Sequence, residues 1–312
     1  MPPIDNPKCL TARAAPTTKK PPDMPELPEV EVVRRRLSGL VLERTIGKVR
    51  ASSANYAFLT PPAQLKRRLT GRQFTAINRH GKYLILALDD GTSFVVHLGM
   101  TGQLFASSAI NPRLYHSRTR AARGTQSEFV PDEHTHLSLE FADGGPKLHF
   151  RDCRKFGKLL WLPKGAAEPR LQRLGVDALQ ITATELLHAS AKRRVAVKAL
   201  LLDQSVLAGV GNIYADETLF LAHIHPLRPA HKLTEPEARE LAKCIRRVLT
   251  RAIARGGSTI DDYVHPDGSE GNFQHSFAVY GREGEPCRRC RSPIARVVIG
   301  QRSSHYCSEC QR

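Results

Sequence analysis

Four cysteines near the end of the sequence constrain its fold most strongly, because they form two close pairs. The pattern is Cys287-x2-Cys290-x16-Cys307-x2-Cys310. Each pair has the spacing with which two thiolates bind one tetrahedral metal ion, and the segment between the pairs suits a β-hairpin. Four thiolates leave no open coordination position, so the pattern predicts one structural Zn²⁺ ion. Residues 279–312 are therefore expected to form a zinc finger.

The segment between the two cysteine pairs has the pattern of a hairpin with a basic tip. Val297, Val298 and Ile299 are apolar, and Gln301, Arg302 and Ser303 follow them. Such a hairpin would present Arg302 beside its tip.

A second informative run, Met24-Pro25-Glu26-Leu27-Pro28-Glu29, lies near the start of the sequence. If the chain begins at Met24, removal of that Met leaves Pro25 with a free secondary amine beside the Glu26 carboxylate. An α-amine has a pKa of about 7.7–8.0, so part of it is unprotonated near neutrality. It can then attack an electrophilic carbon such as a sugar C1′ and form a Schiff base. The run would also suit an ordinary helix start, with Pro28 in the first turn.

Residues 1–23 precede this run and have the composition of a flexible extension, with six prolines and little to bury. In a chain that keeps them, the nitrogen of Pro25 is an amide without nucleophilicity. We therefore expect that translation starts at Met24 or that the extension is removed, so that the mature protein lacks it.

The net charge indicates a polyanionic partner. The 312 residues include 47 Lys and Arg against 30 Asp and Glu, a net charge of +17, and residues 24–312 alone carry +15. Nucleic acid is the commonest such partner, and a basic surface kept for solubility is the alternative. Neither a run of 18 apolar residues nor a secretory signal is present, so a cytoplasmic protein with reduced thiols is expected.

Residues 24–163 are expected to form a first domain of mainly antiparallel strands. A helix should begin near Glu29, with Val30, Val33 and Leu37 on its apolar face and Gly39 near its end. Asp89–Gly91 and Asp143–Gly145 have the pattern of hairpin turns. The predicted strands are Thr45–Val49, Phe74–Asn78, Tyr83–Leu88, Phe94–Leu98, Leu137–Phe141 and Lys147–Phe150. A β-sandwich with flanking helices is the expected arrangement.

Residues 164–278 have a helical pattern and should form a second domain. Thr182-x-x-Glu185 and Thr234-x-x-Glu237 are capping boxes. Between them, glycines precede Asn212, which is expected to cap a helix and leave amide N–H groups free for a phosphate. The basic residues Arg193 and Lys198 nearby favour phosphate binding over a simple helix connection.

With these motifs together, residues 24–312 resemble the formamidopyrimidine-DNA glycosylases of bacteria, which remove oxidised purines in base-excision repair. The resemblance implies an α+β protein: an N-terminal antiparallel β-sandwich, then a helix–two-turn–helix bundle and a four-cysteine zinc finger. It implies duplex DNA with oxidised purines (8-oxoguanine, formamidopyrimidines) as the partner, one structural zinc ion, no membrane and a monomer near the nucleoid. It also implies base flipping, a Schiff base at Pro25 and β,δ-elimination.

The same resemblance assigns roles to individual residues. Pro25 is the nucleophile, Glu26 assists opening of the sugar, Lys82 assists elimination and Arg302 donates a proton in δ-elimination. Met100 and Phe156 would fill the space of the flipped base, and Arg154 would pair with the orphaned cytosine. The remaining expected DNA contacts are His134, Arg193, Lys198 and Asn212. A polar loop at residues 257–277 would cover the base, and residues 107–133 form an insertion without an assigned role.

Two other functions fit parts of the sequence. An endonuclease VIII-like glycosylase for oxidised pyrimidines shares the general pattern, although Leu27, Met100, Arg154 and Phe156 favour the purine branch. A non-catalytic protein that binds damaged DNA would result if residues 1–23 permanently block the amine of Pro25.

Overall fold

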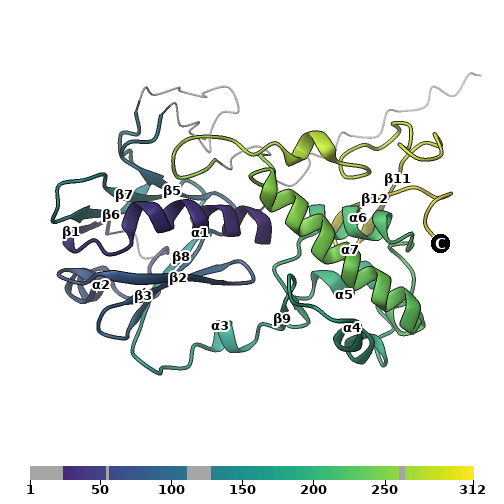
Figure 1. Ribbon diagram of the computed structural model, residues 1–312, viewed down its shortest axis with the longest axis horizontal. Coiled ribbons are helices and arrows are strands. Elements are labelled where there is room, and N and C mark those ends of the chain that lie inside the picture. The colour runs from purple at the N-terminus through teal and green to yellow at the C-terminus, as the bar shows by residue number, and fades with distance from the viewer. Residues whose placement is uncertain (1–23, 54–55, 111–127, 260–263) are drawn as a thin grey trace, which may run out of the picture.

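The computed structural model describes residues 24–53, 56–110, 128–259 and 264–312. The predicted extension at residues 1–23 lies outside this part, as do residues 111–127 of the expected insertion and residues 260–263 of the polar loop. Figure 1 shows two lobes side by side, with α1 running from one toward the other. None of the helices in the described part has the length and apolar character needed to cross a bilayer.

Helix α1 (Leu27–Val41) is the first element of the N-terminal lobe. A capping box between Glu26 and Glu29 starts it, and the apolar stripe that includes Val30, Val33 and Leu37 is buried. The helix was expected to end near Gly39 but continues two residues further. A glycine inside a helix costs only about 1 kcal/mol relative to alanine, and the next turn buries Val41 in the core.

Two four-stranded sheets form the predicted antiparallel β-sandwich around one apolar core. The first sheet has the order β1-β6-β7-β5 and the second β2-β3-β4-β8. Their strands are β1 (Ile46–Ala51), β2 (Phe74–His80), β3 (Tyr83–Leu88), β4 (Ser93–His97), β5 (Gly102–Ala106), β6 (Thr135–Phe141), β7 (Leu148–Asp152) and β8 (Lys158–Leu162). Both predicted hairpin turns are confirmed, between β3 and β4 and between β6 and β7. Strands β5 and β8 and helix α2 (Pro62–Leu69) were not predicted.

The C-terminal lobe is helical, as the sequence predicts. Its helices are α3 (Pro169–Gln172), α4 (Ala183–Ser190), α5 (Val197–Leu202), α6 (Asn212–Leu221), α7 (Glu235–Ala254) and the short η1 (Ala230–Lys232) and η2 (Phe273–Ser276). Strands β9 (Val176–Asp177) and β10 (Leu207–Ala208) form a small parallel pair. Both predicted capping boxes are present, on α4 and α7. Gly256 and Gly257 follow α7 with positive φ angles and end it.

The finger follows as a hairpin of β11 (Ala295–Ile299) and β12 (Arg302–Tyr306). Ile299 pairs with Arg302, which leaves a two-residue turn at Gly300 and Gln301. Both turn residues have positive φ, 53° and 63°, the geometry that matches the twist of the flanking strands. A small apolar cluster with Phe220 of α6 attaches the finger to the helical lobe.

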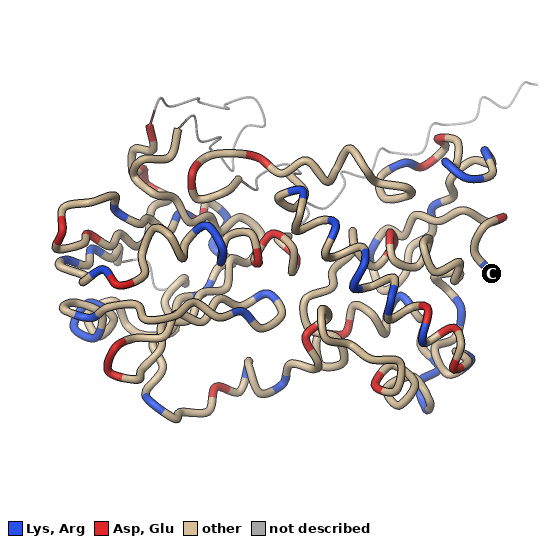
Figure 2. The backbone as a smooth tube through the Cα atoms, in the orientation of Figure 1, with Lys and Arg blue, Asp and Glu red and all other residues tan. Residues whose placement is uncertain are grey.

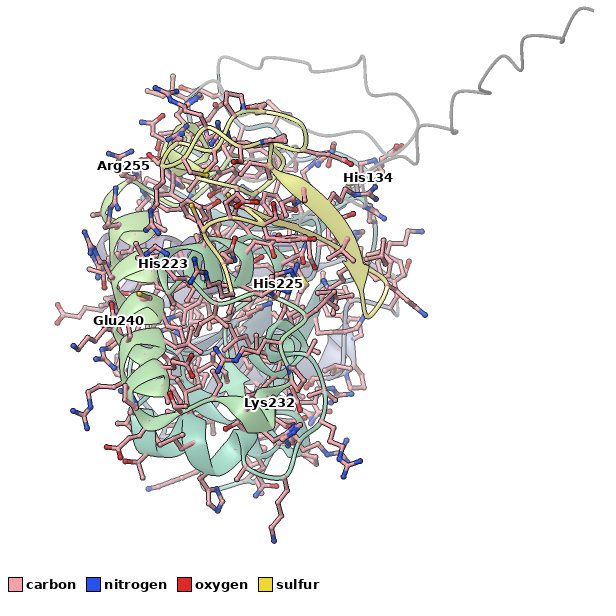
Figure 3. All side chains as sticks on the ribbon, turned by 90° about the vertical axis from the view of Figure 1, so that its right-hand side faces the viewer. His134, His223, His225, Lys232, Glu240 and Arg255 are labelled. Atoms are coloured by element: carbon pink, nitrogen blue, oxygen red, sulfur yellow. The ribbon has the colours of Figure 1, made fainter. Side chains whose placement is uncertain are left out.

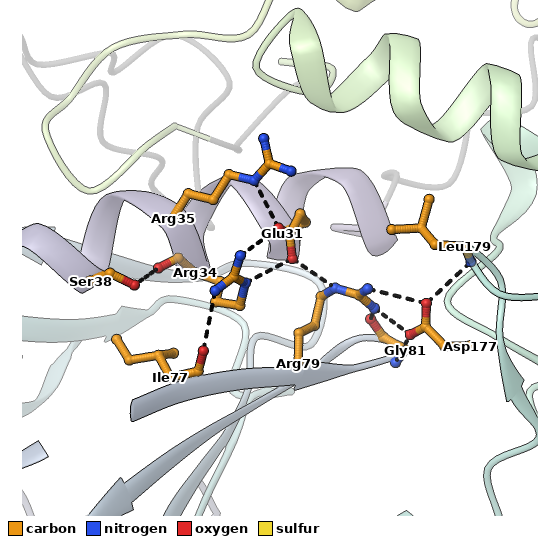
Figure 4. Close-up of polar contacts among 9 residues, drawn as sticks. All are labelled: Glu31, Arg34, Arg35, Ser38, Ile77, Arg79, Gly81, Asp177 and Leu179. Carbon is orange, nitrogen blue, oxygen red and sulfur yellow. Dashed lines mark hydrogen bonds and ion pairs between the residues drawn. The ribbon is translucent and has the colours of Figure 1, made fainter. Parts of the chain in front are cut away.

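Several contacts join the lobes, including one at Leu27 and one at Arg79. Leu27 of α1 packs into the core of the C-terminal lobe, and its N–H donates to the carbonyl of Gly209 at 3.0 Å. Below α1, the guanidinium of Arg79 bridges Glu31 (3.1 Å) and Asp177 (2.5 Å), as Figure 4 shows. Burial alone would raise the pKa of Glu31, but hydrogen bonds from Arg34, Arg35 and Arg79 outweigh it and lower that pKa to about 2. This ionic bridge fixes the tip of the β2–β3 hairpin against the C-terminal lobe.

Candidate active site

The carboxylate of Glu26 lies at the N-terminus of α6. It accepts hydrogen bonds from the backbone N–H groups of Gly211 (2.7 Å), Ile213 (3.0 Å) and Tyr214 (3.4 Å). The partial positive charge of a helix N-terminus favours a carboxylate there. The sequence predicted that these amides would be free for a phosphate. That prediction is wrong, because Glu26 occupies them.

Glycines allow this close approach between α1 and α6. A Cβ atom on Gly211 would lie 2.3 Å from Cδ of Glu26, and one on Gly209 would lie 2.5 Å from Cδ1 of Leu27. Gly209 also has a φ of 110°, a value that side chains disfavour. The glycine-rich turn therefore serves the contact with the start of α1.

Asn212 does not cap α6 as predicted, because Gly211 is the N-cap and Asn212 is the first helical residue. Its side-chain amide instead donates to the carbonyl oxygen of Ser303 in β12 at 3.1 Å. Asn212 thus contacts the finger at Ser303, the residue that follows Arg302.

Glu29 is a buried member of this site that the sequence indicated only as a helix-start residue. It accepts hydrogen bonds from the hydroxyl of Tyr214 (2.5 Å) and the N–H of Ser258 (2.8 Å). Burial raises the pKa of Glu29, although these hydrogen bonds oppose the shift. Glu29 therefore joins α1, α6 and the segment after α7. Spacing along the chain gives no sign of these distant partners.

Lys82 lies at the turn between β2 and β3 and is only 7% exposed. Burial lowers its pKa, the charge of Arg302 lowers it further, and the carboxylates of Glu26 and Glu29 raise it. Within the described residues its ammonium forms no hydrogen bond or ion pair. A lysine with a lowered pKa releases its proton more easily, which favours a role in acid–base steps.

Arg302 is exposed beside the turn of the finger hairpin. Its charge acts on Lys82 and on Lys198, so the hairpin brings Arg302 into the electrostatic range of the residues around Glu26. Pro25, which is buried, directly precedes Glu26. We refer to Pro25, Glu26, Lys82 and Arg302 as the Glu26 corner.

Lys198 is fully buried, which contradicts the predicted role in gripping a DNA phosphate. Its ammonium lies 2.7 Å from Oδ1 of Asp216 and donates to Oγ of Ser304 (2.7 Å) and the carbonyl of Ser303 (3.0 Å). Burial lowers the pKa of Lys198, and the charge of Asp216 opposes that shift. The sequence shows the charge of Lys198 but not that three partners already surround it. Lys198 instead holds β12 against α5 and α6.

The residues expected to fill the space of a flipped base lie in two adjoining loops, residues 98–102 and 153–157. Asp152 organises both: its carboxylate accepts hydrogen bonds from the hydroxyl of Thr101 (2.6 Å) and the N–H groups of Arg154 (3.2 Å) and Gly157 (2.7 Å). Phe156 is 50% exposed, an unusual position for a phenylalanine. We call these segments the Asp152 loops. No role was predicted for Asp152.

Met100 is partly exposed in the first of these loops, and the Arg154 guanidinium lies 5.6 Å from the centroid of the Phe156 ring. His134 adjoins the same region, since its carbonyl accepts the N–H of Asp152 at 2.9 Å. Arg193 lies elsewhere, on the C-terminal lobe, where it pairs with Asp203 at 2.6 Å. The structure therefore groups Met100, His134, Arg154 and Phe156 and leaves Arg193 apart.

The four cysteines of the finger converge on one point. Their Sγ atoms all lie within 4.8 Å of one another, with 3.9 Å between Cys287 and Cys310 and 3.4 Å between Cys290 and Cys307. Tetrahedral zinc with Zn–S bonds of about 2.3 Å requires sulfur atoms about 3.8 Å apart. The cluster therefore fits one structural zinc ion, as predicted.

Comparisons with known proteins agree with this architecture along the chain. Family models match the formamidopyrimidine-DNA glycosylase N-terminal domain at residues 24–159, the H2TH domain of the same enzymes at residues 174–264, and a zinc finger found in FPG and IleRS at residues 284–312. The formamidopyrimidine-DNA glycosylases of Heliobacterium modesticaldum and Cereibacter sphaeroides are each 42% identical to this chain, covering 93% of it and all of the relative.

Solved structures give the same result. The MutM (Fpg) protein of Thermus thermophilus is 39% identical with a TM-score of 0.77, covering 92% of this chain and 98% of its own. The Lactococcus lactis Fpg mutant G226P in complex with Fapy-dG DNA is 32% identical with a TM-score of 0.79, covering 92% and 100%. Both therefore share the fold described above over most of this chain. The chain belongs to the formamidopyrimidine-DNA glycosylase family.

Proposed function

We propose that this protein is a bifunctional DNA glycosylase and AP lyase that removes oxidised purines from duplex DNA. The observation that carries the proposal is the Glu26 corner, in which a buried carboxylate, a lysine of lowered pKa and an exposed arginine surround the start of α1. Family membership indicates the class of reaction, and the proposed reaction uses the carboxylate, the lysine and the arginine of this corner.

In the proposed reaction, Glu26 assists opening of the sugar ring while the amine of Pro25 attacks C1′ and the oxidised base leaves. The resulting iminium acidifies the C2′ proton. β-Elimination and then δ-elimination cut the strand on both sides of the sugar, with Lys82 transferring protons and Arg302 donating one in the second step. The zinc ion holds the finger and takes no part in these steps.

We propose that Met100, Arg154 and Phe156 fill the space left by the flipped nucleotide, and that His134, Arg193 and Asn212 contact the backbone. The partial exposure of Met100 and the half-exposed Phe156 ring support this assignment. Lys198 supports the site indirectly through β12. The same division into residues 24–163, 164–278 and 279–312 is proposed for the domains, because each part supplies most of the residues of one apolar cluster. We place the protein in the cytoplasm, at the chromosomal DNA.

Oxidised pyrimidines remain the competing substrate class. Solved complexes of the Lactococcus lactis protein contain Fapy-dG DNA, abasic-site DNA and oxidised-pyrimidine DNA. We expect faster excision from an 8-oxoguanine:cytosine duplex than from a thymine glycol duplex. The reverse order would assign the chain to the endonuclease VIII-like function.

Trapping the Schiff base tests the chemistry directly. Proteins beginning at Met1 and at Met24 are incubated with an 8-oxoguanine:cytosine duplex and sodium borohydride, and the DNA-linked residue is identified by mass spectrometry. We expect a link at Pro25 when the chain begins at Met24 and none while residues 1–23 are attached. If both proteins bind the lesion and neither is trapped, the chain is a damage-binding protein without catalysis.

A further inference from the structure

The exposed face of α7 carries a regular stripe of positive charge, visible as the repeated blue segments of that helix in Figure 2. Its members are Arg239, Lys243, Arg247, Arg251 and Arg255, each four residues after the last and all exposed. Residues four apart on a helix are neighbours on one face, so the five cations are aligned. From residue 241 to residue 255 the sequence contains five basic side chains and no acidic one.

Most of this charge has no counter-charge among the described residues. The acidic partners found there lie near the start of the helix, where Arg239 pairs with Glu235 at 2.6 Å and Lys243 lies 3.7 Å from Glu240. In the described part of the chain, Arg247 and Arg251 form no side-chain hydrogen bond or ion pair. Arg255 donates only to the hydroxyl of Ser276.

The positive surface continues onto the finger. Arg288 donates to the carbonyl of His275 at 3.4 Å, next to the residue that Arg255 contacts. Arg289 lies 4.6 Å above the ring of Phe220 and close enough to Cys244 of α7 to influence its thiol. We define the rear patch as Arg247, Arg251, Arg255, Arg288 and Arg289.

Helix stability does not account for the stripe. The helix dipole stabilises cations in the last turn of a helix, but it has little effect on cations in earlier turns. Arg247 lies about two turns before the end of α7, and Lys243 about three. Like charges four residues apart destabilise a helix by about 0.2–0.5 kcal/mol per pair. An external anion would remove this repulsion.

Helix α7 and the finger hairpin lie on opposite sides of the view in Figure 3. In Figure 3, α7 runs along the left edge with Arg255 and Glu240, whereas the finger strands that carry Arg302 lie toward the right. A straight duplex in contact with Arg302 therefore does not also cover α7. The stripe is about 24 Å long, the length of roughly seven base pairs along a duplex.

We propose that the rear patch binds the phosphate backbone of a second segment of duplex DNA while the first segment occupies the active-site face. Contacts to phosphates carry no sequence information, so this binding is independent of sequence. Binding of the second segment lets the protein transfer from one DNA segment to another while it searches for lesions. The inference depends only on DNA as the partner and not on the glycosylase chemistry.

The test is a capture assay with the full chain. A short biotinylated duplex with an uncleavable abasic analogue is immobilised and saturated with protein, and a fluorescent undamaged duplex is then added at several salt concentrations. The variant R247A/R251A/R255A is compared with K48A/K66A/R67A, which removes three exposed cations that have no acidic partner among the described residues of the N-terminal lobe. Both variants are checked for unchanged melting temperature and unchanged cleavage of a short lesion duplex.

We expect the wild-type protein and K48A/K66A/R67A to capture the second duplex equally, and R247A/R251A/R255A to bind it at least about tenfold more weakly. The slope of log affinity against log salt should fall by about 2.7, since each lost phosphate contact removes about 0.9. Equal capture by all three proteins, or equal loss in both variants, would overturn the proposal. Preferential capture of a labelled polyglutamate peptide would also overturn it and assign the patch to an acidic protein.

Discussion

The Glu26 corner and the Asp152 loops are built in opposite ways. Glu26 and Lys82 are only 3% and 7% exposed, and the corner combines groups from the N-terminal lobe and the finger, with Glu26 held by an amide of the C-terminal lobe. The Asp152 loops come from one lobe and leave Phe156 half exposed. Groups that would carry out the chemistry are thus positioned in advance, whereas side chains that would enter the DNA have few partners until it binds.

Replacing Lys82 with methionine should have the largest effect, because it removes the proton-transfer group of the corner. Strand cleavage should fall by about 10²–10⁴-fold, measured in single-turnover assays. The free energy of unfolding, by contrast, should rise. Because the folded-state pKa of Lys82 lies below 10.5, a charged Lys82 destabilises the fold at neutral pH.

The pH dependence separates this explanation from a packing effect. Between the lowered pKa and 10.5 the unfolded chain binds more protons, so wild-type stability rises with pH and the advantage of Lys82→Met shrinks. Urea denaturation at pH 7 and pH 10 measures both points. Lys82→Arg, which keeps the charge, should show no gain at either pH. A Lys82→Met protein less stable than wild type at pH 7 would contradict this account.

Lys198→Met should show that the corner depends on a buried ion pair behind it. The change leaves Asp216 buried and unpaired, which costs about 3–5 kcal/mol of unfolding free energy. The finger strand then loses its anchor, so the share of δ-elimination product should also fall. Lys198→Met combined with Asp216→Asn, which retains an acceptor for the N–H of His305, should recover most of the stability. Recovery of neither property would show that the pair does not position β12.

Gly211→Ala tests the close contact between Gly211 and the carboxylate of Glu26. The new Cβ would lie 2.3 Å from the carboxylate carbon and must displace it. A shift of about 1 Å at a reacting group costs about 100-fold in rate, so base excision should fall by that factor. Gly39→Ala is the control, since no atom within 4 Å would meet its Cβ, and it should leave the rate unchanged and slightly stabilise α1. An equal effect of both changes would refute the close contact.

Asp152→Ala should have the smallest effect and should alter binding more than chemistry. Three hydrogen bonds that order the Asp152 loops are lost, so KM for a lesion duplex should rise about tenfold, or about 1.4 kcal/mol. The catalytic rate constant should stay within a few-fold. Asp90→Ala removes a similar turn contact, to Thr92, far from the site and should change neither constant. A loss confined to the rate constant would show that the loops belong to the catalytic group.

Local patterns in the sequence predicted much of this fold. Capping boxes at Thr182 and Thr234 identified two helices, and the cysteine spacing identified the finger. Strand β5 was missed because all five of its residues are buried, including Gly102 and Gln103, so no alternation marks it.

The contacts of the site could be predicted less well, because burial and distant partners leave no local signal. The acceptor role of Glu26 depends on amides up to 188 residues away. Lys198 has the charge of a phosphate contact, but only the packed structure shows that Asp216 and β12 enclose it. The amide groups at the start of α6 were likewise predicted to bind a phosphate, although the carboxylate of Glu26 binds them.

This last contact has a consequence for biosynthesis. The carboxylate of Glu26 and the amide of Gly211 are 185 residues apart, and Arg302 is made later still. During translation, the start of α1 therefore leaves the ribosome long before the residues that bind Glu26 are synthesised. A chain that stops short of its last hairpin, or folds without zinc, carries Glu26 without Arg302 in place. With Arg302 acting in δ-elimination as proposed, that second cut would require a completed chain that holds its metal.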